Sequence, residues 1–305
     1  MEASAEQMMR LSDAVEICYQ TFGSPRSPPI LLLAGASQSM LAWNADFIAK
    51  LSPSSNPHFV IRYDYRDTGR STHYPVLPQD VSPQEITPHY TLTGLCNDAI
   101  ALLDHLKIDS ANFVGFSMGG GIACYIAGEL APKRVRSLAL LSTSPVGPAP
   151  GPDDGLSPMS PELLDEIRAL HPPNDWHEKI QVVAFLTEVE KLLQHVPPTV
   201  EEEVEARELL ERIFDRTQAG GDGLQCIYNH GPVVFPCWPR EALRHVRCPT
   251  VVIHGRSDRN FALPHAEALA KEIEGAKLVV LDDMAHELPR RCWDRIAQEI
   301  VDTSS

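Results

Sequence analysis

Short apolar segments alternate with longer amphipathic segments along most of this chain. Six of the short segments are almost entirely apolar, as strands must be when helices cover both faces of a sheet. They lie at residues 30–33, 59–63, 112–114, 138–141, 251–253 and 278–281. Residues 91–106 place apolar side chains on one helical stripe, and a second such helix is expected from 285 onward. Residues 14–19 alternate, which predicts an antiparallel edge strand. The pattern predicts a mostly parallel central sheet with helices on both faces.

The alternation breaks after Thr143. Six prolines between 145 and 161, interleaved with glycines, indicate a linker rather than a helix or strand. Residues 160–224 then show helical periodicity, and strand patterning resumes only at Val251. We therefore expect an inserted helical lid at 146–240 and a core made of 1–145 and 241–305. The lid is expected over the carboxyl ends of the strands, where open parallel sheets bind ligands. A separate accessory domain without a catalytic role is the alternative.

The segment Gly115-Phe116-Ser117-Met118-Gly119 follows a predicted strand and precedes an apolar helix. In that setting Gly-x-Ser-x-Gly is typical of a nucleophile elbow. The turn is so tight that the serine takes a strained backbone conformation, and only glycine fits at the two flanking positions. Such a turn lifts the Ser117 hydroxyl clear of the sheet edge. The simpler alternative is an ordinary Gly/Ser loop that caps a helix, and the partners downstream decide against it.

A serine nucleophile needs a base, and the base needs a carboxylate that orients it. Among the twelve histidines, His286 follows a predicted strand and precedes a helix, so its ring can face the same sheet edge as Ser117. Asp258 comes a few residues after the strand at 251–253, which gives the chain order Ser, Asp, His. In the competing interpretation Asp258 only caps a turn, or Asp282 or Asp283 holds the histidine.

A tetrahedral intermediate needs two hydrogen-bond donors aimed at its oxyanion. The amide of Met118 lies in the first turn of the predicted helix, whose dipole also favours negative charge. The second donor is expected from the loop after the strand at 30–33. There Gly35 allows the turn and the amide of Ala36 can point inward, with Gly35 and Ser37 as the alternatives.

Together these residues resemble the α/β-hydrolase superfamily over roughly 30–145 and 245–305. Residues 62–72 read Arg-Tyr-Asp-Tyr-Arg-Asp-Thr-Gly-Arg-Ser-Thr. That version is similar to the aclacinomycin methylesterase group, whose members remove a methyl ester from polyketide-derived molecules and also lack a His-Gly pair at the oxyanion loop. The resemblance implies an α/β-hydrolase fold with Ser117 as nucleophile, Asp258 as acid and His286 as base. The segment 64–71 itself is interpreted as a structural turn network.

The composition of the chain restricts the kinds of binding partner and cofactor that are expected. The 305 residues carry a formal charge of −15 without a lysine or arginine cluster, which disfavours nucleic acid and anionic membranes. No stretch approaches the roughly 18 apolar residues that span a bilayer. Acidic residues stand at the start where a secretory signal would carry basic ones, so a cytoplasmic location is expected. The seven cysteines are scattered without metal-binding spacing, and no metal or organic cofactor is expected. The oligomeric state stays open.

Large aromatic side chains concentrate in the predicted lid. We expect Trp176, Phe235 and Trp238, together with Gly35 and Ser37, to line a mainly apolar substrate pocket. The predicted function is a serine hydrolase that cleaves the carboxylic ester of an apolar small molecule through an acyl-enzyme, with a methyl ester or lactone of a polyketide-like molecule as the specific expectation. The same triad could instead serve C–C bond hydrolysis, dehydration or cyclisation. A non-catalytic small-molecule receptor is the alternative of another class.

Overall fold

A single twisted sheet forms the centre of the protein. The computed structural model describes residues 1–12, 14–79, 81–82, 85–148, 150–151, 153–218, 223–234 and 238–304. Within these ranges the strands follow the order β1-β2-β4-β3-β5-β6-β7-β8. Their bounds are β1 (Gln7–Ser12), β2 (Val15–Phe22), β3 (Pro29–Leu33), β4 (Phe59–Tyr63), β5 (Ala111–Phe116), β6 (Val135–Leu141), β7 (Thr250–Gly255) and β8 (Lys277–Leu281). Strands β4 to β8 in this order are parallel, whereas β1 and β2 are antiparallel to their neighbours.

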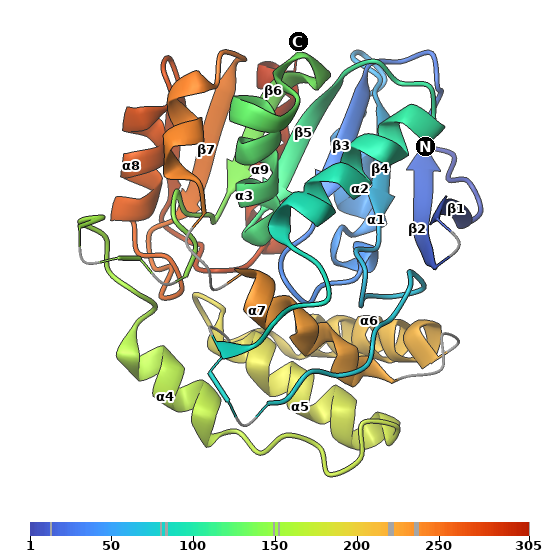
Figure 1. Cartoon of the computed structure of the whole chain (residues 1–305), viewed down its shortest axis with the longest axis vertical. Coiled ribbons are helices and arrows are strands. Elements are labelled where there is room, and N and C mark those ends of the chain that lie inside the picture. The colour runs from blue at the N-terminus through green and yellow to red at the C-terminus, as the bar shows by residue number, and fades with distance from the viewer. Residues whose placement is uncertain are drawn as a thin grey trace.

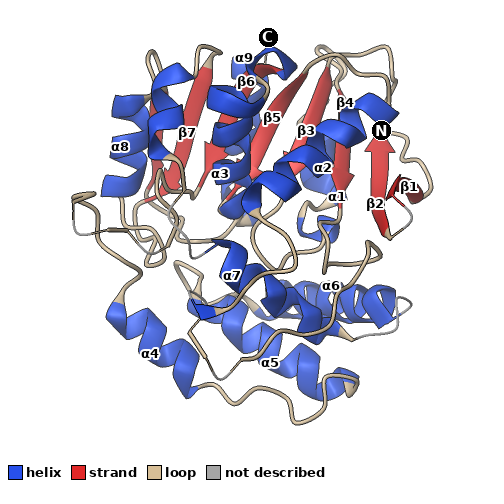
Figure 2. Ribbon diagram, in the orientation of Figure 1, coloured by secondary structure: helices blue, strands red, loops and turns tan. Residues whose placement is uncertain are grey.

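The parallel part of the sheet is the part that the apolar pattern predicts. All six apolar runs lie inside parallel strands, and β4 and β5 are buried along their whole length. Figure 2 shows α2 (Leu92–His105), α3 (Met118–Tyr125) and α8 (Pro264–Glu272) on one face of the sheet, and α1 (Ala45–Lys50) and α9 (Trp293–Thr303) on the other. The predicted α/β-hydrolase architecture, a mostly parallel sheet with helices on both faces, is confirmed.

Two element predictions need correction at the ends of the chain. Residues 15–19 of the predicted edge strand lie in β2, which pairs on both sides, and the edge position belongs to β1. Strand β1 buries only Met9, so it carries almost no apolar alternation that a sequence pattern could detect. The C-terminal helix begins at Trp293 rather than near 285. Residues 285–289 form a loop, and a short 3-10 helix (Arg290–Cys292) follows Pro289.

The segment 146–240, called the lid from here on, contains helices and no strand among its described residues. It comprises α4 (Pro161–Ala169), α5 (Lys179–Leu192), α6 (Val200–Gln218), a 3-10 helix (Leu224–His230) and α7 (Gly231–Val234). A further 3-10 helix (Arg240–His245) begins at its last residue and leads back toward the core. Figure 1 shows α4 to α7 beneath the edge at which the parallel strands end. None of the described helices combines the length and apolar character of a membrane span.

The lid has a small apolar cluster of its own. It consists of Trp176, Val182, Val183, Leu210, Phe214, Leu224 and Ile227. The last part of the lid does not belong to it, because Val233, Val234 and Trp238 pack into the main core instead. The helices α5 and α6 therefore lean on each other, while the end of the lid is built into the body of the protein.

Candidate active site

Ser117 occupies the sharp turn between β5 and α3. Its backbone lies at φ 52° and ψ −119°, a left-handed conformation that non-glycine residues rarely adopt. A side chain at position 115 would collide with the carbonyl of Gly119, and one at position 119 would collide with the carbonyl of Leu33. The turn therefore has the strain and the two obligatory glycines that the motif predicts.

Three of the predicted residues meet at the carboxyl edge of the sheet. His286 Nε2 lies 3.1 Å from Ser117 Oγ, and His286 Nδ1 lies 2.9 Å from Asp258 Oδ2. The carboxylate can only accept, so Nδ1 carries the proton and Nε2 is left to accept from the serine hydroxyl. All three residues are buried, with exposed fractions of 9%, 8% and 4% for the serine, histidine and aspartate. This arrangement can withdraw the serine proton as the oxygen attacks a carbonyl.

The carboxylate of Asp258 is fixed on both oxygens. Its Oδ1 accepts hydrogen bonds from the amides of Asn260 and Phe261, each at 2.8 Å. Burial alone would raise the pKa of this carboxyl, but the charge and hydrogen bond of His286, with smaller contributions from neighbouring groups, hold that pKa below its ordinary value. Asp258 is therefore an anion at neutral pH and can stabilise an imidazolium.

The two alternative acids lie elsewhere. Asp282 is exposed and forms an ion pair with Arg256 at 2.5 Å. Asp283 is exposed as well, and its backbone carbonyl accepts from Arg291 at 2.7 Å. Among the described residues, neither carboxylate forms a hydrogen bond to His286. The geometry favours Asp258 as the acid partner.

Asn260 is a neighbour of the site that the sequence did not single out. Its Nδ2 lies 3.2 Å from His286 Nε2, the same nitrogen that faces the Ser117 hydroxyl. An amide N–H can only donate, so Asn260 competes with the serine for the lone pair of Nε2. The only sign in the sequence that Asn260 lies near His286 is its position two residues after Asp258.

Residues 34–37, which follow β3 and are called the oxyanion loop here, contain three candidate amides that differ in their hydrogen-bond acceptors. The amide of Gly35 donates to Gln38 Oε1 at 2.9 Å, and the amide of Ser37 donates to His230 Nδ1 at 2.8 Å. The Ala36 amide has no hydrogen-bond partner within the described part of the chain. Met118 is the first residue of α3, where the amide has no acceptor within the helix. The amides of Ala36 and Met118 are thus the ones available to a substrate oxyanion.

The matching sequence profile covers most of the chain. The profile of the α/β hydrolase fold matches residues 28–289, which include the elbow, the aspartate and the histidine. The chain belongs to the α/β-hydrolase fold family.

Full-length relatives of this α/β hydrolase include methylesterases. The rhodomycin D methylesterase of Streptomyces peucetius is 30% identical over 307 residues, covering 96% of both chains. The rhodomycin D methylesterase of Streptomyces sp. (strain C5) is 29% identical with the same coverage. Among solved structures, the enol-lactonase from Burkholderia xenovorans LB400 matches with a TM-score of 0.68 at 23% identity, covering 95% of this chain and 97% of that chain. The enol-lactonase likeness supports the fold alone, whereas the sequence relatives agree with the resemblance to a methylesterase group.

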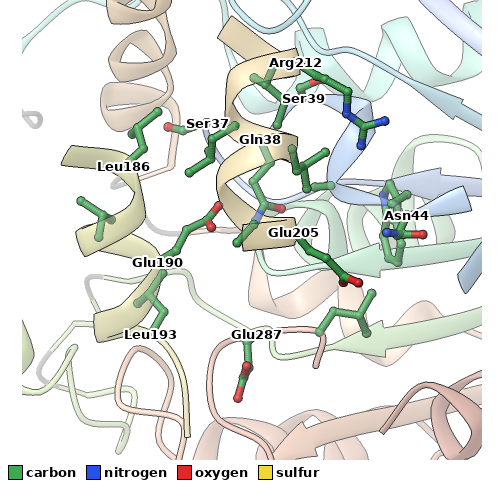
Figure 3. Close-up of a pocket in the computed structure, with 18 of the residues that line it drawn as sticks. Ser37, Gln38, Ser39, Asn44, Leu186, Glu190, Leu193, Glu205, Arg212 and Glu287 are labelled. Carbon is green, nitrogen blue, oxygen red and sulfur yellow. The ribbon is translucent and has the colours of Figure 1, made fainter. Parts of the chain in front are cut away.

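A cavity of about 830 Å³ opens between the sheet edge and the lid of this α/β hydrolase. On the core side its wall includes Ala36, Ser37, Phe116 and His286, and on the lid side it includes residues of α5 and α6 such as Leu186. Figure 3 shows side chains from both sides directed at this space. The cavity therefore reaches the histidine that faces Ser117.

The predicted pocket aromatics occupy other places. Trp176 is buried in the apolar cluster of the lid, where its ring lies edge-on to Phe185 and Tyr228. Trp238 is buried against α3, over Gly121, and Phe235 lies outside the described residues. Neither tryptophan lines the cavity. Of the predicted loop residues, Ser37 lines it and Gly35 does not.

The cavity carries more charge than the expected apolar pocket. Figure 3 shows the Glu190 carboxyl of α5 pointing into it. Within the described residues this carboxylate has neither an ion pair nor a hydrogen bond, whereas the neighbouring Glu205 forms an ion pair with Arg290 at 2.8 Å. Burial raises the pKa of the Glu190 carboxyl to about 7, although its side chain keeps some contact with solvent through the cavity.

The end of α5 is attached to the loop at residues 285–289, called the histidine loop because it carries His286. The carbonyl of Leu193 accepts from the amide of His286 at 3.1 Å. The amide of His195 donates to Glu287 Oε1 at 2.9 Å, next to the same histidine. The lid therefore touches the loop that presents His286.

Proposed function

We propose that this chain is a serine hydrolase that cleaves the carboxylic ester of a small molecule, with Ser117, Asp258 and His286 as its catalytic triad. The observation that carries the proposal is the hydrogen-bonded series from Asp258 through His286 to Ser117, at the wall of a cavity large enough for a small-molecule substrate. Membership in the α/β-hydrolase fold family and the two methylesterase relatives support carboxylic ester hydrolysis as the reaction class.

The steps follow from the geometry. Ser117 Oγ attacks the ester carbonyl while His286 Nε2 takes its proton, and Asp258 stabilises the imidazolium. The amides of Ala36 and Met118 donate to the oxyanion of the tetrahedral intermediate. The imidazolium returns the proton to the departing alcohol, which leaves an acyl group on Ser117. Water, activated by the same His286, then releases the carboxylic acid and restores the hydroxyl.

The finer proposal concerns the substrate and the lid. We propose a methyl ester or lactone of a polyketide-like molecule as the substrate, because the full-length relatives are methylesterases of rhodomycin D. The segment 146–240 would act as a lid over this site, with 1–145 and 241–305 as the core. The position of α5 and α6 along the cavity supports that division.

Product analysis in ¹⁸O-labelled water tests the reaction. The enzyme is incubated with methyl esters and lactones of polycyclic aromatic acids and, for comparison, with a short acetyl ester. Cleavage at the acyl carbon places one ¹⁸O in the carboxylic acid and leaves the alcohol unlabelled. We expect bulky aromatic esters to have the higher kcat/KM, because binding of the remote part of the substrate orients the reacting carbonyl.

Two outcomes would contradict the proposal. Turnover of β-diketones or dienoates in place of esters would assign the triad to C–C bond hydrolysis. Tight binding of the aromatic esters without any product would indicate a receptor. Variants separate the cavity from its surroundings: Leu186→Ala, in the cavity wall, is expected to reduce the preference for bulky esters, whereas Trp176→Phe, in the lid cluster, is expected to leave it unchanged.

A further inference from the structure

The loop that follows β3 is held by a distant part of the lid. The Ser37 amide donates to His230 Nδ1 at 2.8 Å, and Ser37 Oγ donates to the carbonyl of Ile227 at 2.8 Å. The first of these bonds joins residues 193 positions apart. Ser37 itself has a positive φ of 65°, a backbone conformation that needs support from its surroundings. The 3-10 helix of the lid, Leu224–His230, provides that support with two hydrogen bonds.

The chemistry of both partners determines the state of the His230 ring. Its Nε2 lies 2.8 Å from the carbonyl of Arg66, which can only accept. The Ser37 amide can only donate, so Nε2 carries the proton and Nδ1 is the acceptor. The ring is fully buried, and burial lowers the pKa of His230 against the opposing effects of the Arg66 carbonyl and the Asp67 carboxylate. His230 therefore stays neutral, as this pattern of hydrogen bonds requires.

Two side chains accept hydrogen bonds from two of the three amides of the loop. Gln38 Oε1 accepts from the amide of Gly35, and His230 Nδ1 accepts from the amide of Ser37. The amide between them, that of Ala36, is the one left without a partner among the described residues. The peptide planes of consecutive residues are linked, so fixing the amide of Ser37 restricts the direction in which the Ala36 amide points.

We propose that His230 is a positioning residue of the oxyanion hole, through which the lid aims the Ala36 amide at the reacting carbonyl. The inference rests on the proposed function, because it presumes an oxyanion at Ser117. It assigns to the lid a part in stabilising the transition state besides enclosing the substrate. Losing an oxyanion-hole donor altogether costs about 10² to 10³ in kcat. A donor that is only misdirected is expected to cost roughly 10- to 100-fold by the same principle.

Two isosteric variants separate the two ring nitrogens. In His230→Asn the side-chain oxygen can take the place of Nδ1 and accept from Ser37. In His230→Gln the side-chain amide can take the place of Nε2 and donate to the Arg66 carbonyl, while the Ser37 amide loses its acceptor. We expect the kcat of His230→Asn to stay within a few-fold of wild type. The kcat of His230→Gln should be roughly 10- to 100-fold lower than that of wild type. KM is expected to change little in either variant, because the loss falls on the transition state.

A purely structural role would give a different result. His58 is another fully buried histidine, placed just before β4 at the opposite end of the strands, so His58→Asn controls for the loss of a buried imidazole. Equal kcat in His230→Gln and His58→Asn would overturn the proposal, as would an Asn variant as impaired as the Gln variant. Affinity for a trifluoromethyl ketone, which forms an oxyanion on the serine, should fall with kcat in His230→Gln.

A measurement without turnover separates this proposal from the proposed function. The ¹⁵N shifts of the His230 ring in the wild-type protein are expected to show a protonated Nε2 and an unprotonated Nδ1 between pH 6 and 9. A protonated Nδ1 overturns the positioning role whether or not any ester is cleaved. If the shifts are as expected but the wild type cleaves no ester and binds no ketone, the proposed function fails first and the positioning role fails with it.

Discussion

The sheet and the lid are held together in different ways. In the sheet, consecutive strands exchange backbone hydrogen bonds, and apolar side chains are buried over whole strands such as β5. The lid contributes a separate apolar cluster of a few residues, and only its last part packs into the main core. Elsewhere it meets the core through individual polar contacts. Three of them are the ion pair of Arg216 with Asp64, the bond of His230 to Ser37, and the Leu193 carbonyl bonded to the amide of His286.

The difference bears on how the proposed site is assembled. Ser117 is placed by the sheet region, because its turn is held between β5 on one side and α3 on the other. The oxyanion loop and the histidine loop also receive bonds from the lid. The nucleophile is therefore expected to tolerate changes in the lid, while the groups that stabilise charge and move protons depend on it.

The first prediction concerns Ser117, the proposed nucleophile, which is placed by the sheet. Ser117→Ala is expected to lower kcat by about 10⁶-fold, since triad members act as a unit. Its unfolding transition should match that of wild type, because among the described residues the hydroxyl bonds only to His286. Ester turnover and thermal melting are the two measurements. Activity within tenfold of wild type would exclude Ser117 as the nucleophile.

Asp258→Asn changes the proposed acid, which follows strand β7 of the sheet. Asparagine keeps the shape but cannot hold the proton on His286 Nδ1, so kcat is expected to fall by about 10⁴-fold. Asp283→Asn is the control and should leave kcat within a few-fold of wild type. Single-turnover kinetics of both variants check the assignment. A harmless Asp258→Asn with a damaging Asp283→Asn would give the role to the other acid.

The attachment of the lid is tested at Arg216 of α6. Its guanidinium lies 2.5 Å from Asp64 Oδ2, and the Asp64 side chain is fully buried. Arg216→Met removes the ionic partner of that carboxylate, which keeps its hydrogen bonds to Ser39, Met40 and Arg70. The change is expected to lower the free energy of unfolding by about 3–5 kcal/mol. The double variant Asp64→Asn/Arg216→Met should recover most of the loss. Urea unfolding gives both values.

A pair inside the lid provides the control for this experiment. Lys179 and Asp215 lie 2.7 Å apart but are both well exposed to solvent. Lys179→Met is expected to cost less than about 1 kcal/mol. If Arg216→Met lowers the free energy of unfolding by no more than Lys179→Met does, the buried ion pair does not hold the lid to the core.

The last prediction concerns the pH dependence of stability that Glu190 in the cavity causes. Its pKa is about 7 in the folded protein against 4.5 for an ordinary glutamate, so the folded state resists ionisation. The resulting loss of stability is absent below about pH 4.5, grows between 4.5 and 7, and is complete above about 7. The Glu190→Gln variant has no ionisable group at this position and therefore does not show this loss of stability. Thermal melting should therefore show the variant above wild type at pH 8 and equal to it at pH 4.5, and a constant difference would contradict the raised pKa.

The sheet and the proposed triad were largely predictable because their signals are local. An almost wholly apolar run such as 30–33 can hardly be anything but a covered strand, and the elbow encodes its own geometry in the two glycines around Ser117. Strand β1 was missed because it buries only Met9. The late start of α9 was missed because the histidine loop occupies residues 285–289.

The residues that line the cavity could not be predicted from local sequence patterns. Trp176 and Trp238 were chosen for their size, but large aromatics also fill cores, and both do so here. Glu190 lies on a helix with other acidic residues, and only the packing of α5 turns it inward. His230 and Ser37 become partners through the fold alone, because no spacing in the sequence relates them.

Covalent labelling shows whether the Ser117 hydroxyl is activated as a nucleophile. The protein is treated with a fluorophosphonate, digested, and the adduct is located by mass spectrometry in wild type, Ser117→Ala and His286→Ala. We expect a single adduct on Ser117 in the wild type, none in Ser117→Ala, and much slower labelling in His286→Ala. An unlabelled wild type, or an adduct on any other residue, would contradict the assignment of Ser117 as the nucleophile.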